Sequence, residues 1–167
     1  MIKIKEEFKK LIPALTKEEY KQLENNCIAE GIREKILIWN GFIIDGHNRY
    51  EISLKWDLEI QTETKHFKDE EAVKEWMILN QFGRRNLSNY QRSVLALELE
   101  EVFSKKAKEN LGRNQHSSLP TLAKTKVDTR QELSKVANVS HGTLDKVKKI
   151  QAQASEEVKA KLSTGEV

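Results

Sequence analysis

The segment richest in residues that can do chemistry is Ile43–Tyr50, which reads IIDGHNRY. It places Gly46, His47, Asn48 and Arg49 directly after an apolar run and at the start of an expected helix. A turn that opens a helix offers free N–H groups and the positive end of the helix dipole, and both favour a phosphate or carboxylate. Gly46 allows close backbone approach, and Arg49 adds a fixed fork of donors. These residues predict an anion-binding turn, with a tight structural turn and a surface arginine as the alternative.

A second group of donors follows one helix later, at Arg84, Arg85 and Asn86. Two adjacent arginines and an amide can complete an anion pocket with Gly46 and Arg49. They can equally be surface charges on a connector, because the sequence does not show that the two segments meet in space.

Residues 129–150 carry the pattern of a helix-turn-helix. Thr129 to Glu132 form a capping box, Asn138-Val139-Ser140 suit a tight turn, and Ser140 can cap the next helix. In such a motif the second helix enters the major groove of DNA. An ordinary helical hairpin is the alternative.

The exposed positions of this motif suggest two kinds of contact with double-stranded DNA. Base edges would be met from the first turn of the second helix, by Ser140, His141 and Thr143. Phosphates would be met by the basic side chains Arg130, Lys146, Lys148 and Lys149. Asn138 stands where glycine is usual, and asparagine tolerates the left-handed backbone of such a turn.

The charge of the chain is unevenly distributed. Residues 104–150 hold eleven Lys/Arg and four Asp/Glu, a local charge of +7, whereas the whole chain carries +3 and the remainder therefore −4. A basic half joined to a mildly acidic half indicates a polyanion partner for the basic half, although solvated lysine-rich helices give the same signal.

The composition narrows the class of protein. With 167 residues, 38% hydrophobic and 33% charged, the chain suits one compact domain or two small ones. The single Cys27 cannot form an internal disulfide, which fits a cytoplasmic location, and its place on a helical face suggests buried filler. No apolar stretch approaches the roughly 18 residues of a spanning helix, and the four scattered histidines suggest no metal site.

Periodicity and turn residues predict the elements that position these groups. In the first half we expect a helix between Thr16 and Gly31, a hairpin of 36–39 and 42–44 around Asn40-Gly41, a helix over 49–54 and a weak strand within 58–66. A helix from Asp69 would bury one face, consisting of Ala72, Val73, Trp76, Met77 and Asn80.

From residue 88 onward the sequence predicts helices only. Ser88 would cap a helix carrying Val94, Leu95, Leu97, Leu99 and Val102, and 110–127 would form a long loop or mobile link. In the helix-turn-helix, Leu133, Val136, Ala137, Leu144, Val147 and Ile150 would face inward. We therefore expect an α+β protein, with a small mixed-sheet α/β domain over 1–87 and an all-helical DNA-binding domain over 88–167.

Four segments in this order resemble proteins of the ParB/sulfiredoxin superfamily. FIIDGHNRYEI is similar to the GERR-type box, and NQFGRRNLSNYQR to the ENLQR-type segment that follows it in ParB partition proteins. LIPALTKEEYKQLENNCIAEGI resembles the helix that precedes the hairpin, and TRQELSKVANVSHGTLDKVKKI resembles the family's helix-turn-helix. The resemblance is strongest to ParB-like proteins of plasmids, phages and other mobile elements. The ending KAKLSTGEV is similar to the start of a longer helical segment, so we expect a truncation after Val167.

The resemblance implies a nucleotide pocket in the first domain that is coupled to DNA binding by the second. In ParB partition proteins the nucleotide is CTP with Mg²⁺, which acts as a clamp switch after loading at a DNA site. Gly46 and Arg49 match the box, and Arg84 matches the arginine of the second segment. CTP or another nucleotide is thus an expected ligand.

The departures from the family pattern bear on catalysis. His47 stands in place of a glutamate, Asn48 and Glu51 in place of arginines, and Asn80 in place of the second segment's glutamate. Loss of both carboxylates removes the means of holding Mg²⁺ and polarising water, so CTP hydrolysis is not expected. We name no catalytic residues.

An enzyme remains the alternative class. Small-molecule kinases of the superfamily have a DG-x-HR-like box, and Asp45-Gly46-His47-Asn48-Arg49 is similar to it. His47 would then be a general base or phosphate contact, or else a histidine that satisfies turn carbonyls. The sulfiredoxin cysteine has no counterpart here.

The combined expectation is a sequence-specific DNA-binding protein that acts in partition, replication control or regulation, with an anion or nucleotide pocket gating DNA binding. A single recognition helix binds DNA weakly, so we expect a homodimer. A partition ATPase is a further possible partner, through the basic, amphipathic segment Met1–Lys10.

Overall fold

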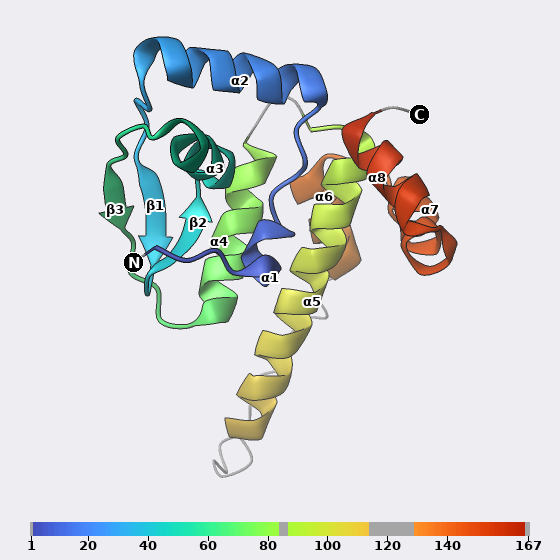
Figure 1. Cartoon of the computed structure of the whole chain (residues 1–167). Helices are drawn as coiled ribbons and strands as arrows, with labels where there is room; N and C mark the ends of the chain where they lie inside the picture. Colours follow the sequence, from blue (N-terminus) through green and yellow to red (C-terminus); the bar gives the residue numbers. More distant parts are fainter. Residues whose placement is uncertain (1, 84–86, 114–128, 166–167) are drawn as a thin grey trace. The chain divides into compact units, whose positions relative to one another are not determined.

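The structure, a computed structural model, describes residues 2–83, 87–113 and 129–165 (Figure 1), with the side chains of 106–130 and of residue 132 outside that description. The chain forms two compact units, the first consisting mainly of Met1–Met77 and the second of Ile78–Ser163. Within the described part of the chain, no helix is both long and apolar enough to cross a membrane.

The first unit is built around a small mixed sheet with strand order β2-β1-β3. Its elements are α1 (Glu6–Lys9), α2 (Lys17–Glu30), β1 (Ile36–Trp39), β2 (Phe42–Asp45), α3 (His47–Trp56), β3 (Thr62–Thr64) and α4 (Glu70–Phe82), the last of which continues into the second unit. Strand β1 is antiparallel to β2 and parallel to β3. Helix α3 packs against both α2 and β1.

The predicted hairpin is confirmed. Asn40 and Gly41 have φ angles of 48° and 81°, the left-handed backbone that a two-residue turn between twisted strands requires. Ile38 faces Ile43 across the pair, and Trp39 faces Phe42. The weak third strand also exists, but it covers only Thr62–Thr64 of the expected stretch.

Helix α2 begins and ends at the predicted signals. Thr16 and Glu19 form a reciprocal capping box, and Gly31 ends the helix with φ 74°. Cys27 is buried, as its position on the helical face predicted.

The N-terminal segment packs against this unit. Lys3 forms an isolated β-bridge with Phe42, the first residue of β2. Phe8 of α1 is completely buried, and its ring centroid lies 6.3 Å from that of Trp39. Residues 2–10 are therefore part of the fold, which the basic, amphipathic composition of this segment did not reveal.

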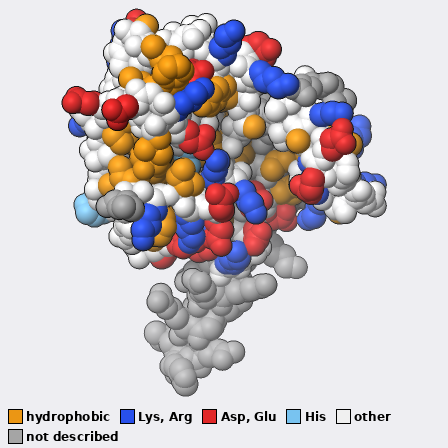
Figure 2. All heavy atoms as spheres, in the orientation of Figure 1, with side chains coloured by type: hydrophobic (Ala, Val, Ile, Leu, Met, Phe, Trp, Pro, Cys, Tyr) orange, Lys and Arg blue, Asp and Glu red, His pale blue; other side chains and the backbone are white. Residues whose placement is uncertain are grey.

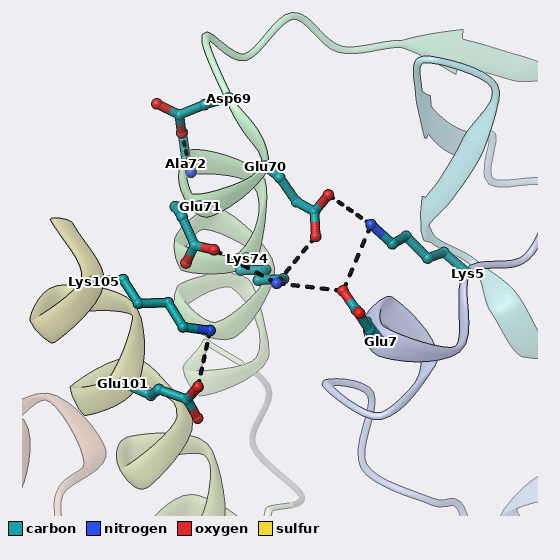
Figure 3. Close-up of polar contacts among 9 residues, drawn as sticks. All are labelled: Lys5, Glu7, Asp69, Glu70, Glu71, Ala72, Lys74, Glu101 and Lys105. Atoms are coloured by element: carbon teal, nitrogen blue, oxygen red, sulfur yellow. Dashed lines mark hydrogen bonds and ion pairs between the residues drawn. The ribbon is translucent and has the colours of Figure 1, made fainter. Parts of the chain in front are cut away.

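An ionic network joins α1 to the start of α4 (Figure 3). The Lys5 ammonium lies 2.6 Å from a Glu70 carboxylate oxygen, and Lys74 lies 3.0 Å from Glu70 and 3.5 Å from Glu7. Hydrogen bonding from Lys5, helped by Lys74, lowers the pKa of Glu70 to about 2.

Two positions of α4 differ from the expected pattern. Val73 and Met77 are buried as predicted, but Asn80 is exposed, whereas Ile78 and Gln81 are fully buried. The buried stripe therefore shifts from 73 and 77 to 78 and 81 along the helix, a drift that a single amphipathic face does not anticipate.

The second unit is helical and consists of the end of α4, α5 (Asn89–Arg113), α6 (Thr129–Ala137), α7 (His141–Gln153) and α8 (Glu156–Thr164). Ser88 and Gln91 form the cap that opens α5, and Leu95, Leu99 and Val102 are buried along it, as predicted. Helix α5 extends through Arg113, so the prediction of a loop from residue 110 is wrong for residues 110–113. Residues 114–127 of that expected loop lie outside the described residues.

Helix α5 packs against both α6 and α7, which also contact each other. Ala96, Ala137 and Leu144 form the buried centre of this unit, and Phe82 and Val139 pack against it. Val136 was expected to face inward but is 44% exposed, because the buried stripe of α6 runs through Leu133, Ser134 and Ala137.

Candidate nucleic-acid interface and anion-binding turn

The turn between α6 and α7 has the backbone that the sequence predicted. Asn138 adopts φ 54°, and its N–H donates to the Lys135 carbonyl at 3.1 Å. The next N–H, of Val139, donates to the Ser134 carbonyl at 3.1 Å, which ends α6 and directs the chain into α7. The short turn and the half-buried Val139 thus hold two short helices together, as in a helix-turn-helix.

Ser140 is the N-cap of α7. Its Oγ accepts a hydrogen bond from the Thr143 N–H at 3.2 Å and lies 2.9 Å from the Thr143 hydroxyl. The hydroxyls of Ser140 and Thr143, which the sequence predicted at base edges, therefore contact each other at the cap of α7.

His141 is the first residue of α7 and is exposed. Its Nε2 lies 3.4 Å from the Oγ of Ser134, a buried residue of α6. The sequence analysis missed Ser134, because a serine within an expected apolar face carries no signal of its own.

The basic residues of α7 fall into two groups. Lys146 and Lys149 are exposed, and neither has an ion-pair partner among the described residues. Lys148 lies 3.8 Å from Glu100 of α5, so part of its charge is already compensated. Arg130 begins α6, but its side chain lies outside the described residues. In the view of Figure 2, basic and acidic side chains are interspersed over the visible surface.

A cavity of about 220 Å³ lies beside this motif, between α5, α6 and α7. Its lining is apolar at Ala96, Leu97, Leu133 and Leu144 and charged at Glu100, Asp145 and Lys148. Helix α7 therefore presents Leu144 to the core and to this cavity, which leaves its first turn and the opposite side for contacts with a partner.

The turn before α3 is built around Gly46, the N-cap of that helix, with φ 92°. A Cβ at this position would lie 2.8 Å from the Ile36 Cδ1 and 3.2 Å from an Arg49 guanidinium nitrogen. Glycine is thus required here both for the left-handed backbone and for packing inside the protein.

Arg49 is oriented toward carboxylates. Its Nη2 donates to the Asp45 Oδ2 at 3.1 Å, and its Nη1 forms an ion pair with Glu34. Only 14% of the Arg49 side chain is exposed. The sequence analysis missed Glu34, which precedes the hairpin. Asn48 is half-buried, and Arg84, Arg85 and Asn86 lie outside the described residues.

His47 lies in the first turn of α3 and is 2% exposed. Neither ring nitrogen has a hydrogen-bond partner within the described structure, so the alternative in which it satisfies turn carbonyls is not observed. Burial lowers the pKa of His47, although the nearby carboxylates of Asp45, Glu51 and Glu6 oppose this effect.

The described part of this turn fits a phosphate poorly. A phosphate would have to displace the Glu34 carboxylate from Arg49 and would still face the Asp45 carboxylate. Among the described residues, no cluster of three or more His, Cys, Asp or Glu side chains suits a metal ion.

Comparison with known proteins places this geometry in a known fold. No family model and no curated protein matches the chain. Two solved structures of the pNOB8-like ParB N-domain superpose on it with TM-scores of 0.62 and 0.56, at 15% and 18% identity, over 87% and 90% of this chain. The chain has a ParB-like fold. It spans 64% and 61% of the length of those two chains.

A C-terminally truncated chromosome-partitioning protein ParB from Caulobacter crescentus, complexed to the centromeric parS site, also matches, with a TM-score of 0.46 and 17% identity, over 92% of this chain and 70% of that one. The ParB-like fold confirms the α+β architecture expected from the sequence, a small mixed sheet with helices followed by a mostly helical part. At these identities the similarity concerns the fold, so the roles of individual residues rest on the geometry described above.

Proposed function

We propose that this protein binds double-stranded DNA sequence-specifically through α6 and α7, in plasmid or chromosome partition, replication control or transcriptional regulation. The observation that carries the proposal is the turn at Asn138, which holds α7 against α5 and α6 while leaving its capped first turn exposed. The ParB-like fold supports it, since proteins named ParB N-domains share this architecture.

In this proposal the first turn of α7 enters the major groove, where each base pair presents a distinct pattern of donors and acceptors. His141 and Thr143 would contact base edges, and Ser140 would fix the start of the helix. Lys146 and Lys149 would neutralise phosphates, with Lys148 and Arg130 in the same role.

One helix of 13 residues gives too small an interface for tight, specific binding. We therefore propose that two copies bind two half-sites of a palindrome. A partition ATPase stays a proposed further partner.

The test is selection of preferred sites from a random duplex library, followed by fluorescence anisotropy on the selected site. Lys146→Ala should weaken binding to every sequence, because a phosphate contact carries no sequence information. His141→Ala should relax the preference at particular base pairs. Lys161→Ala is the matched control, because Lys161 lies on α8 and pairs with Glu157. Unchanged affinity and unchanged preference in both α7 variants would exclude this docking.

We also propose, as a second function, that the turn before α3 binds CTP or another nucleotide and gates DNA binding. His47 is buried at the start of α3, and its two ring nitrogens have no hydrogen-bond partner in the part of the chain that the structure describes, which supports a polar ligand there. The carboxylates around Arg49 argue against a phosphate, so this proposal requires Glu34 to move away.

Titration calorimetry with CTP, ATP, GTP and ADP, with and without Mg²⁺, tests this second function. Nucleotide binding that Glu34→Gln strengthens and Arg49→Ala abolishes would support it, because the first change removes the competing charge and the second removes the phosphate donor. Arg33→Ala is the control, since Arg33 is an exposed arginine that directly precedes Glu34 in the sequence. No heat with any nucleotide would leave only the DNA-binding function.

A further inference from the structure

Ser134 and His141 connect the two helices of the helix-turn-helix through a short chain of hydrogen bonds. Ser134 is only 9% exposed, and its Oγ donates to the Gln131 carbonyl at 3.0 Å. The same Oγ lies 3.4 Å from the Nε2 of His141. A buried hydroxyl of α6 therefore contacts the imidazole of the first residue of α7.

The hydrogen bond to Gln131 favours one direction for the contact between Ser134 and His141. A serine hydroxyl has one hydrogen to donate and lone pairs with which to accept. When the Ser134 hydroxyl donates to the Gln131 carbonyl, its oxygen accepts from the imidazole. In the neutral ring the hydrogen then resides on Nε2, and Nδ1 is an acceptor.

The Nδ1 of His141 is available to a partner. His141 is exposed at the first position of α7, and among the described residues only Ser134 contacts its ring by a hydrogen bond. The first turn of a recognition helix is the part that meets base edges.

We propose that Ser134 is a positioning residue that holds His141 in the Nε2–H tautomer, so that α7 presents a hydrogen-bond acceptor to the major groove. In that groove the N6 amino group of adenine and the N4 amino group of cytosine are donors, whereas guanine and thymine present acceptors. His141 then selects adenine or cytosine on the strand that it faces. This inference rests on the proposed DNA binding.

The tautomer is tested first without DNA. Long-range ¹H–¹⁵N NMR of the full chain, in mildly alkaline buffer, distinguishes a protonated from an unprotonated ring nitrogen. We expect His141 to show an unprotonated Nδ1. Ser134→Ala should remove this bias, and Ser134→Thr, which keeps the hydroxyl, should restore it. Alanine favours helices more than serine does, so loss of α6 is not expected to confuse the result.

Site selection from a random duplex library then tests the base preference. The wild-type protein should enrich adenine or cytosine at one position of each half-site, and Ser134→Ala should reduce that preference about tenfold, the usual effect of one mismatched contact. Affinity for non-specific DNA should stay within about twofold, because phosphate contacts are unchanged.

The outcomes separate this inference from the proposed function. An Nδ1–H tautomer, a guanine or thymine at that position, or an unchanged preference in Ser134→Ala would overturn the role of Ser134 while DNA binding stands. Absence of any sequence-specific DNA binding by the wild-type protein would overturn both.

Discussion

At the scale of single residues, the charged groups of the first unit are mostly paired, and His47 differs from them. Arg49 is paired with Asp45 and Glu34, and Lys9 lies 2.6 Å from Glu51. His47 is buried among these groups without a hydrogen-bond partner within the described structure. A buried group that must stay neutral makes stability depend on pH.

We predict that the free energy of unfolding falls as the pH drops below about 6.5, the usual histidine pKa. Burial depresses the pKa of His47 in the folded state, so the unfolded chain binds the proton more readily. Protonation then favours unfolding, by up to about 1.4 kcal/mol per pH unit. Urea denaturation across this range measures the slope.

His47→Gln should flatten this part of the profile, because glutamine does not titrate. His66→Gln is the control, since His66 is an exposed histidine of the same unit. An equal slope in the wild type and His47→Gln would show that another group causes the pH dependence.

The ion pairs of Glu70 add a second loss of stability on acidification, at lower pH than that of His47. Hydrogen bonding from Lys5 keeps the pKa of this carboxylate at about 2, so its stabilising effect is complete above the ordinary value of about 4.5 and is lost as the pH falls toward 2. Because the side chain is 34% exposed, solvent screening reduces the expected effect of Glu70→Gln at neutral pH to about 1 kcal/mol.

Denaturation at neutral and at strongly acidic pH measures this effect. The wild type and Glu70→Gln should differ at neutral pH and converge in acid. Glu59→Gln, at an exposed position outside the network, should match the wild type in both conditions. An equal difference in the free energy of unfolding at both pH values would mean that Lys5 and Lys74 do not stabilise the charged form of Glu70.

At the scale of elements, the first turn of α7 contains a glycine that neither capping nor packing requires. Gly142 is exposed, and a Cβ there would meet only the Ser140 Oγ, at 3.9 Å. Glycine in a helix costs roughly 0.5–1 kcal/mol relative to alanine. At the start of the proposed recognition helix, a glycine would let another molecule approach the backbone closely.

We predict that Gly142→Ala raises the free energy of unfolding by roughly 0.5–1 kcal/mol and weakens DNA binding. The two effects have opposite signs, so loss of folding cannot explain the weaker binding. Gln153→Ala, at the far end of α7, is the control for binding. Thermal denaturation and fluorescence anisotropy give the two values, and DNA affinity equal to that of the wild type would show that this turn lies away from the DNA.

Elements defined by local signals could be predicted from the sequence, and contacts between distant residues could not. The Asn40-Gly41 turn, the Thr16 cap and the Ser140 cap each depend on a few neighbouring residues, and all three are confirmed. The pairing of Arg49 with Glu34 depends on how the chain folds back, which no local pattern encodes.

The same distinction explains the candidate sites. The exposed lysines of α7 follow from helical periodicity around Leu144 and Val147, so their positions were predictable. The hydrogen bond between Ser134 and His141 depends on the angle between two helices. That angle depends on the left-handed backbone at Asn138. The sequence predicts the left-handed residue, but it does not predict which side chains the turn brings together.

At the scale of the whole molecule, electrostatics should dominate affinity, because the chain carries +3 overall while residues 104–150 carry eleven Lys/Arg and four Asp/Glu. The logarithm of the DNA binding constant should fall linearly with the logarithm of salt concentration, with a slope of about −0.9 for each phosphate neutralised. Lys146 is exposed and without an ion pair among the described residues, so its contribution should appear fully in this slope.

The change in slope also reports the number of copies on the DNA. Lys146→Ala should reduce it by about 0.9 if one copy binds and by about 1.8 if two copies bind a palindrome. Lys148→Ala should change it less, because Glu100 already offsets part of that charge. Sedimentation of the complex gives the stoichiometry independently. A stoichiometry of two with no change of slope in Lys146→Ala would mean that the dimer binds through a face other than α7.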